Sequence, residues 1–248
     1  MLKKILVTFD IDGTLLLADE GRKIQMQSII HAYTKFFGKP PVFKNSNPMS
    51  IFQFMYHGIT DSAAFKSVFV KKKFHFQQKD INEIIKYYDD FYVKQDLGHV
   101  IEFPGVRNCI RQLRGMKGVY VAIASGSTEK TAIYKMENAN RINSEVQPFC
   151  GAFGDINDLR CSCIEQAKKT TENRINSKID EVLHIGDTPG DAMGAIFAHA
   201  TPIVVETGEY RKKDFPHFAT VIKNMEDGID VILNTVKSLQ KRKGQFSI

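Results

Sequence analysis

Close to the start of the chain lies Ile5-Leu6-Val7-Thr8-Phe9-Asp10-Ile11-Asp12-Gly13-Thr14, a β-branched and apolar run that ends at two aspartates and a glycine. Continuous runs of this kind are typical of strands that are buried on both faces of a parallel sheet. The run over 5–9 is far too short for a membrane span, which needs about 20 residues, or for a signal-peptide core. The sequence therefore predicts a buried strand with a polar site at its carboxyl end.

Two more runs follow the same pattern and also end in small polar or acidic residues. Val119–Ala124 ends at Ser125, and Glu181–Ile185 ends at Gly186-Asp187. Weaker strand signals cover 202–205 and 220–222, and helical patterns lie between the strands at about 105–117, 127–139, 158–173, 189–199 and 226–242. Strands that are separated by single helices form βαβ units, so the sequence predicts an α/β fold with a doubly wound parallel sheet.

The stretch from about residue 18 to residue 98 does not follow this alternation. It has no strong strand signal, and apolar residues recur at helical spacing in Ile81, Ile84, Ile85, Tyr88 and Tyr92. Fifteen of the 26 aromatic residues also lie between Tyr33 and Tyr92. We therefore expect a helical cap domain with its own small core over 18–98, inserted into a core domain made of 1–17 and 99–248.

The composition is that of an ordinary globular protein, with 43% hydrophobic and 25% charged residues. The net charge is +6, and basic residues cluster at Lys71–Lys73 and Lys237–Lys243. Both clusters are short, whereas nucleic-acid binding usually needs a broad basic face that makes roughly six to ten phosphate contacts. We interpret the clusters as solvated surface and expect no nucleic-acid partner. The four cysteines form no CxxC pair, which favours free thiols in a reducing compartment and a cytoplasmic location.

The ends of the three strong strands carry the residues from which a site could form. In an open parallel sheet, ligands bind beyond the carboxyl ends of the strands, so neighbouring strands would bring together Asp10, Asp12, Ser125, Asp187 and Asp191. Clustered carboxylates repel one another unless a cation lies among them, and all-oxygen ligands beside phosphate favour Mg²⁺. Asp10 and Asp12 taken alone are equally compatible with a turn that caps a helix. The combination at three strand ends predicts a metal and phosphate site.

These motifs resemble those of the haloacid dehalogenase-like hydrolase superfamily, specifically its capped (subfamily I) phosphatases of the phosphoglycolate-phosphatase-like branch. The first signature of the family is matched by Phe9–Leu15, the second by Ala124-Ser125-Gly126 and the fourth by His184–Asp191. Arg160, which begins a predicted helix, lies where the third motif has Lys or Arg. Similarity extends to Gly58-Ile59-Thr60-Asp61, Phe103-Pro104-Gly105-Val106, Gly151–Asp155 and Thr207-Gly208-Glu209-Tyr210. The resemblance implies a Rossmann-like catalytic core, a helical cap inserted after the first strand, and a phosphoric monoester hydrolase.

The resemblance also implies the chemistry of the first and fourth motifs. Asp10 is expected to attack phosphorus and become an aspartyl phosphate. Asp12 is expected to protonate the leaving alkoxide and then to activate water as a base. Mg²⁺ is expected to be held by the carboxylates of Asp10 and Asp187 and by the main-chain carbonyl of Asp12.

The remaining motif residues are expected to bind the phosphoryl group. By the same resemblance, Ser125 and the Gly126 amide contact the phosphoryl oxygens, and Arg160 neutralises their charge. Asp191 is expected to orient Arg160 or a water on the metal rather than to contact the substrate. Lys168 and Lys169 lie on the same predicted helix as Arg160, but about 12 Å of helix separates Lys168 from Arg160.

Other functions share part of this pattern. Dehalogenases of the superfamily need no leaving-group acid and no metal, so Asp12 and Asp187 make dehalogenation improbable. A phosphomutase of the β-phosphoglucomutase type shares every core residue named above, and the sequence does not separate it from a phosphatase. A catalytically inactive basic binding module on the same fold is disfavoured because the carboxylates are intact.

The cap is expected to select the leaving group by shape and polarity. One candidate cap loop carries His57, Thr60 and Asp61; we expect Thr60 and Asp61 to contact the substrate and interpret His57 as a surface histidine. A cap that closes over the site favours a small diffusible phosphomonoester, phosphoglycolate-like or a sugar phosphate. We expect no membrane partner, and a monomer or weak dimer.

Overall fold

The centre of the protein is a six-stranded parallel sheet in the order β5-β4-β1-β6-β7-β8. A computed structural model of the chain describes residues 2–54, 58–139, 142–146 and 151–241. The strands are β1 (Ile5–Phe9), β4 (Val119–Ala124), β5 (Gly151–Ala152), β6 (Glu181–Gly186), β7 (Thr201–Val205) and β8 (Thr220–Ile222). The predicted parallel α/β fold is confirmed, and β1 lies between β4 and β6 with both pairings parallel.

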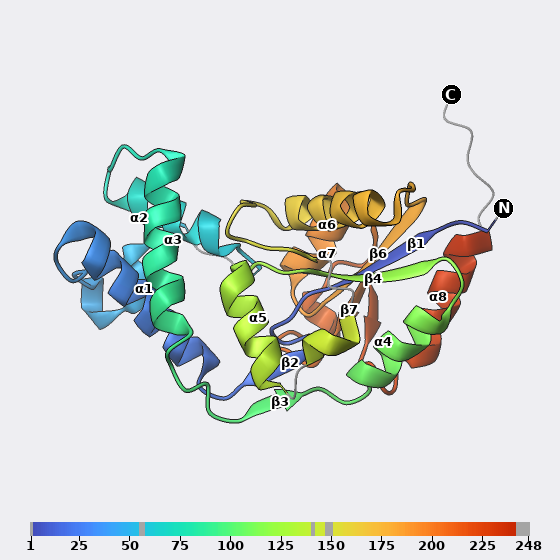
Figure 1. Cartoon of the computed structure of the whole chain (residues 1–248). Helices are drawn as coiled ribbons and strands as arrows, with labels where there is room; N and C mark the ends of the chain where they lie inside the picture. Colours follow the sequence, from blue (N-terminus) through green and yellow to red (C-terminus); the bar gives the residue numbers. More distant parts are fainter. Residues whose placement is uncertain (1, 55–57, 140–141, 147–150, 242–248) are drawn as a thin grey trace.

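Helices cover both faces of the sheet, because successive side chains of a strand point to opposite faces. Leu6 packs in one buried cluster with α6 (Arg160–Ile175) and α7 (Pro189–Phe197). Its neighbours Ile5 and Val7 belong to a second cluster with α4 (Val106–Gly115) and α8 (Ile229–Lys241). Figure 1 shows these helices on the two faces of the sheet, with α5 (Glu129–Asn138) between the sheet and the helices at the far end of the molecule.

Within the described part of the predicted cap, three α-helices lie beyond the carboxyl ends of the strands (Figure 1). They are α1 (Gly21–Phe37), α2 (Asp61–Lys71) and α3 (Gln78–Tyr92). An antiparallel pair of short strands, β2 (Leu16–Ala18) and β3 (Val100–Glu102), stands where the chain leaves and re-enters the core. We did not predict this pair, because three residues are too few for a periodic signal. It lies at the expected boundary of the 18–98 domain, which stays a prediction.

The core of the cap is not separate from the core of the sheet, which corrects our expectation. Buried cap residues such as Phe65, Phe69 and Tyr88 belong to the same cluster as Ile5 and Val7. Rings from α1 and from the turn after α2 pack around Phe69 of α2, with interplanar angles between 33° and 71°, as the aromatic enrichment suggested. The cap is therefore held to the core by continuous apolar packing as well as by polar contacts.

The predicted elements of the core lie within a few residues of the observed ones. Four of the five predicted core helices start one to three residues later than their patterns suggested, whereas α7 starts at the predicted residue 189. β6 ends one residue after its predicted run, and β7 begins one residue before its predicted run. The two-residue strand β5 was not predicted. Short 3₁₀ turns occupy Lys44–Ser46, Pro48–Ile51, Ile142–Val146 and Lys212–Asp214. Within the described ranges, none of the helices combines the length and the apolar character that crossing a membrane requires.

Candidate active site

The carboxyl ends of the three central strands open into one cavity of about 630 Å³. Asp10 and Asp12 follow β1, Ser125 follows β4, and Asp187 follows β6. These strands are direct neighbours, so the residues come together as their positions suggested. The cap closes the other side of the cavity with Gln25, Met26, Ile29, Met49, Ile59, Asp61 and Tyr92.

Asp187 lies in a notch between two glycines. Gly13 has a positive φ of 79°, and a Cβ built on it would lie 2.1 Å from Asp187 Oδ2. A Cβ on Gly208 would lie 1.8 Å from the same oxygen. Thr14 Oγ1 lies 3.3 Å from Asp187 Oδ1 and donates a hydrogen bond to it. A side chain at residue 13 or 208 would therefore occupy the space that the Asp187 carboxylate fills, so both positions need glycine.

Three buried carboxylates could face a metal ion. Oxygens of Asp10, Asp187 and Asp191 lie within 4.8 Å of one another. Burial raises the pKa of Asp10, although the charge of Arg160 opposes this. Burial, together with the neighbouring charges of Asp191 and Asp10, raises the pKa of Asp187 well above its ordinary value. A bound cation would remove this repulsion, and the all-oxygen donor set fits a hard divalent ion.

Asp191 differs from the other two because its oxygens are already engaged. Oδ2 accepts hydrogen bonds from the Thr188 amide at 3.0 Å and the Thr188 hydroxyl at 2.6 Å, in a capping box that starts α7. Oδ1 lies 3.0 Å from Arg160 Nε and 3.3 Å from His184 Nε2. Burial alone would raise the pKa of Asp191, but Arg160 and the hydrogen bonds hold it below its ordinary value. Asp10 and Asp187 are thus the carboxylates of this group that remain available to a metal.

Arg160 is the first residue of α6 and lies against the end of β1. Its Nη1 donates to Asp10 Oδ1 at 2.9 Å and to the Ala124 carbonyl at 3.3 Å. Its Nε is at ion-pair distance from Asp191 but does not point its hydrogen at that oxygen. The side chain is only 8% exposed, and it lines the cavity. Arg160 is therefore a buried cation placed between two carboxylates of the strand ends.

Ser125 and Gly126 form the turn after β4 at the cavity wall. The Ser125 amide donates to Ala152 at 3.1 Å, and its hydroxyl accepts a hydrogen bond from the Ser127 amide at 3.3 Å. A Cβ on Gly126 would lie 2.9 Å from the Ile59 carbonyl of the cap and 3.1 Å from Arg160 Nη2. Core and cap backbones therefore approach closely at this turn.

In the predicted cap loop, Thr60 and Asp61 lie in different surroundings. Thr60 is fully buried and caps α2, since its Oγ1 accepts a hydrogen bond from the Ala63 amide at 3.3 Å. Asp61 lines the cavity and accepts a hydrogen bond from the Thr128 amide at 3.0 Å. Burial raises the pKa of Asp61 to about 6, against the opposing charge of Lys135. His57 lies outside the described residues. The roles of Thr60 and Asp61 toward a substrate stay predictions.

Lys135 lines the same cavity and was not predicted. It lies on α5, and its Nζ donates to Asp12 Oδ2 at 2.6 Å and to Ser127 Oγ at 3.0 Å. The available signal was its position, because Lys135 interrupts a buried helix face formed by Thr131, Ala132 and Met136. A buried lysine needs a partner for its charge, and here the partner, Asp12, lies 123 residues earlier in the sequence.

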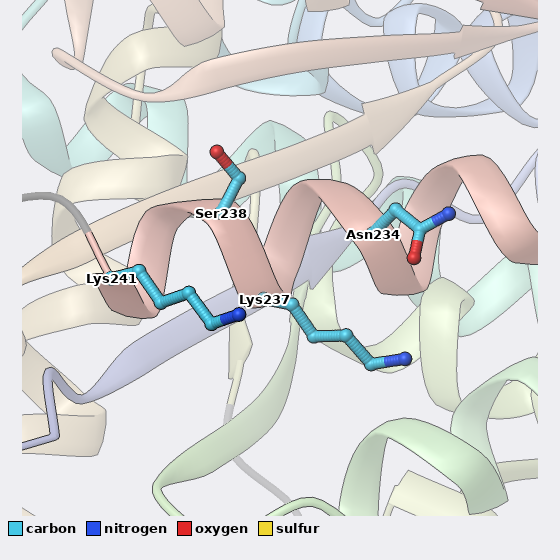
Figure 2. Close-up of a pocket in the computed structure, with 4 residues that line it drawn as sticks. All are labelled: Asn234, Lys237, Ser238 and Lys241. Carbon is cyan, nitrogen blue, oxygen red and sulfur yellow. The ribbon is translucent and has the colours of Figure 1, made fainter.

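A second cavity of about 540 Å³ lies on α8, far from these strand ends in the sequence. Figure 2 shows that Asn234, Lys237, Ser238 and Lys241 line it, all from this one helix. All four residues are exposed. Among the residues that the structure describes, no strand end and no carboxylate lines it, so the strand-end cavity is the candidate active site.

The sequence matches the protein-family model described as haloacid dehalogenase-like hydrolase over residues 6–199. Similar solved structures include a predicted phosphatase from Clostridium acetobutylicum, with 18% identity, a TM-score of 0.62, and coverage of 94% of this chain and 100% of that one. CbbY from Rhodobacter sphaeroides in complex with phosphate has 14% identity and a TM-score of 0.61, and the match covers 92% of this chain and 96% of that one. A predicted phosphoglycolate phosphatase from Haemophilus somnus has 14% identity and a TM-score of 0.57, and the match covers 93% of this chain and 98% of that one. At these identities the likeness shows the fold alone. A search of curated proteins finds no match.

Proposed function

The chain belongs to the haloacid dehalogenase-like hydrolase family, and from this premise we propose that it is a magnesium-dependent phosphatase of small phosphomonoesters that works through an aspartyl phosphate on Asp10. One observation carries the proposal. Asp10 lies at the end of β1, paired with the buried Arg160, and lines the strand-end cavity together with a second carboxylate two residues later. Phosphate monoesters hydrolyse extremely slowly in water, so a nucleophile, positive charge and a proton donor are all needed.

The first half-reaction transfers the phosphoryl group to Asp10. A carboxylate oxygen of Asp10 forms a bond to phosphorus, the bond from phosphorus to the ester oxygen breaks, and Asp12 gives its proton to the leaving alkoxide. Arg160, the Ser125 hydroxyl and the Gly126 amide are the groups that we assign to the phosphoryl oxygens. Asp10, Asp187 and the Asp12 main-chain carbonyl would hold Mg²⁺, which would supply further positive charge beside these oxygens.

The second half-reaction releases phosphate. Asp12, now ionised, takes a proton from a water molecule, whose oxygen attacks phosphorus and breaks the bond to Asp10. Inorganic phosphate leaves, and both aspartates return to their starting states. Asp191 contributes indirectly in this scheme, because it holds Arg160 beside Asp10.

The cap supports a small substrate. Main-chain hydrogen bonds join the start of α2 to the core, from Asp61 to Gly126 at 2.8 Å and from Ser62 to Gly154 at 2.7 Å. Lys66 and Asp158 add an ion pair of 2.5 Å across the same junction. A cap seated in this way leaves room for a small phosphate ester, and it excludes a macromolecule from the strand ends.

The test is a turnover screen of phosphoglycolate, small sugar phosphates and an activated aryl phosphate, with Mg²⁺ and with EDTA. We expect phosphate release that needs the metal, because the Asp10 and Asp187 carboxylates repel each other and the phosphoryl oxygens without it. Asp10→Asn should remove both turnover and the phosphoenzyme, which is detected by intact-protein mass spectrometry after acid quench.

Three outcomes would contradict the proposal. Unchanged turnover in EDTA would remove the metal assignment, and an isomeric sugar phosphate in place of released phosphate would indicate a mutase. Binding of the esters without any turnover would indicate an inactive binding module.

A further inference from the structure

Lys135 is a buried cation in contact with the carboxylate of Asp12. Its side chain is 5% exposed, whereas the side chain of Asp12 is 49% exposed. The ammonium lies 2.6 Å from Asp12 Oδ2, and it lies 5.6 Å from the centre of the Tyr92 ring, which also lines the cavity. The cation is thus fixed in the wall while its partner faces the cavity.

Ser127 completes the anchor. Its hydroxyl accepts a hydrogen bond from Lys135 at 3.0 Å and donates one to Asp12 Oδ2 at 3.2 Å. Two donors therefore hold the same oxygen of Asp12. The other oxygen, Oδ1, has no hydrogen bond or ion pair within the described part of the chain.

The packing of this helix face gives no reason for a lysine at this position. The neighbouring residues on this face of α5 are small or apolar, and burying an ammonium carries a desolvation penalty that an ion pair often only offsets. A Met or Leu would pack on this face at similar volume. A residue that is unfavourable for stability and points at a reactive group suggests a contribution to activity.

We propose that Lys135 is a positioning residue for Asp12. Together with Ser127 it fixes Oδ2, so that Oδ1 is the oxygen that gives the proton to the leaving group and takes one from water. This inference rests on the proposed phosphatase function. It names a residue on α5 that acts through Asp12 and does not itself touch the phosphoryl group.

The variants are Lys135→Met, Lys135→Arg and Ser127→Ala, with Asp12→Asn as the benchmark. Lys130→Met is the matched control, because Lys130 lies on the same helix and pairs with the exposed Asp90 at 2.6 Å. Each protein is assayed with an alkyl phosphate, whose leaving group needs a proton, and with an activated aryl phosphate, whose leaving group does not. Thermal unfolding of every variant is measured in parallel.

We expect Lys135→Met to lower kcat on the alkyl phosphate by about 10- to 100-fold, because Asp12 is no longer held in the orientation that proton transfer needs. KM should change less than about threefold. On the aryl phosphate the first turnover should stay near the wild-type rate, followed by a slower steady state as phosphoenzyme accumulates. Asp12→Asn should show the same pattern more strongly, Ser127→Ala more weakly, and Lys135→Arg should recover part of the rate. The melting temperature of Lys135→Met should not fall below that of Lys130→Met.

Two results would overturn the role of Lys135 while leaving the phosphatase intact. One is a loss for Lys135→Met no larger than that for Lys130→Met, and the other is a raised KM with unchanged kcat, which would mean that Lys135 binds the leaving group. Failure of the wild-type protein to form a phosphoenzyme would instead remove the proposed function, and the role of Lys135 with it.

Discussion

The two carboxylates that follow β1 each form an ion pair with a different buried cation. Arg160 contacts Asp10, and Lys135 contacts Asp12. The first pair includes the carboxylate that we assign to attack on phosphorus, and the second includes the carboxylate that we assign to proton transfer. Because each aspartate has its own cation, we expect loss of Arg160 to impair transfer of the phosphoryl group and loss of Lys135 to impair proton transfer.

At this scale we expect Arg160→Ala to lower kcat/KM by at least about 100-fold, near 2.7 kcal/mol, as for loss of a charged contact to a transferring phosphoryl group. The substitution also leaves Asp10 and Asp191 without their cation. Lys168→Ala, on the same helix but absent from the cavity lining, should stay within about threefold of the wild type. Steady-state kinetics on one phosphate ester measure both. The reverse ranking would mean that the third motif is misplaced.

Between elements, the cap and the core come into close backbone contact where α2 meets the loops after β4 and β5. Gly126 and Gly154 accept hydrogen bonds from the first turn of α2 through their carbonyls. A Cβ on Gly154 would lie 1.9 Å from the Gly126 carbonyl oxygen and 2.9 Å from Thr60 Cβ. The Gly126 backbone and the buried Thr60 therefore leave no room for a side chain at residue 154.

We therefore expect Gly154→Ala to destabilise the fold by about 1–3 kcal/mol, since overpacking forces the loops apart. For a chain of this length that corresponds to a fall in Tm of about 2–4 °C per kcal/mol. KM for the phosphate ester should rise, because the cap no longer seats on the core. Gly115→Ala is the control, since nothing lies within 4 Å of a Cβ at that position. Equal effects of the two substitutions on Tm and KM would contradict the tight junction.

At the scale of the whole molecule, a half-buried carboxyl lies where the cap meets the core. Asp89 of α3 accepts a hydrogen bond from the Thr128 hydroxyl at 2.6 Å, and burial raises the pKa of Asp89 to about 7. The Thr128 hydrogen bond and the charge of Lys130 oppose this shift, whereas Asp61 and Asp155 add to it. A carboxyl whose pKa rises on folding holds its proton in the folded state. Its contribution to stability is therefore fully present below about pH 4 and is lost as the pH rises toward 7.

Asp89→Asn removes this titration. We expect the stability of the variant relative to the wild type to be about 1–3 kcal/mol greater at pH 8 than at pH 5, because the wild type must ionise a half-buried carboxyl at the higher pH. Urea unfolding at the two pH values measures the difference. Asp90→Asn is the neighbouring control, since its exposed carboxylate pairs with Lys130, which lowers the pKa of Asp90. The prediction is wrong if Asp89→Asn gains no more at pH 8 than at pH 5.

The sequence by itself determined the features that depend on local pattern. The apolar run Ile5–Phe9, the glycine at 13 and the helix that starts at Arg160 were all visible as short-range signals, and strand–helix alternation was enough to predict the parallel sheet. Rules for parallel sheets then placed the strand ends together, so the candidate site followed from the topology.

Only the tertiary structure decided which residues meet across long separations. Lys135 and Asp12 are 123 residues apart, and Asp89 and Thr128 are 39 apart on cap and core. Neither pairing leaves a periodic signal, because each depends on how a helix packs on the sheet or the cap. The short β2–β3 pair and the shared core of cap and sheet are of the same kind. Local patterns specify elements, whereas the partners of a buried charge are fixed by the packing that removes it from water.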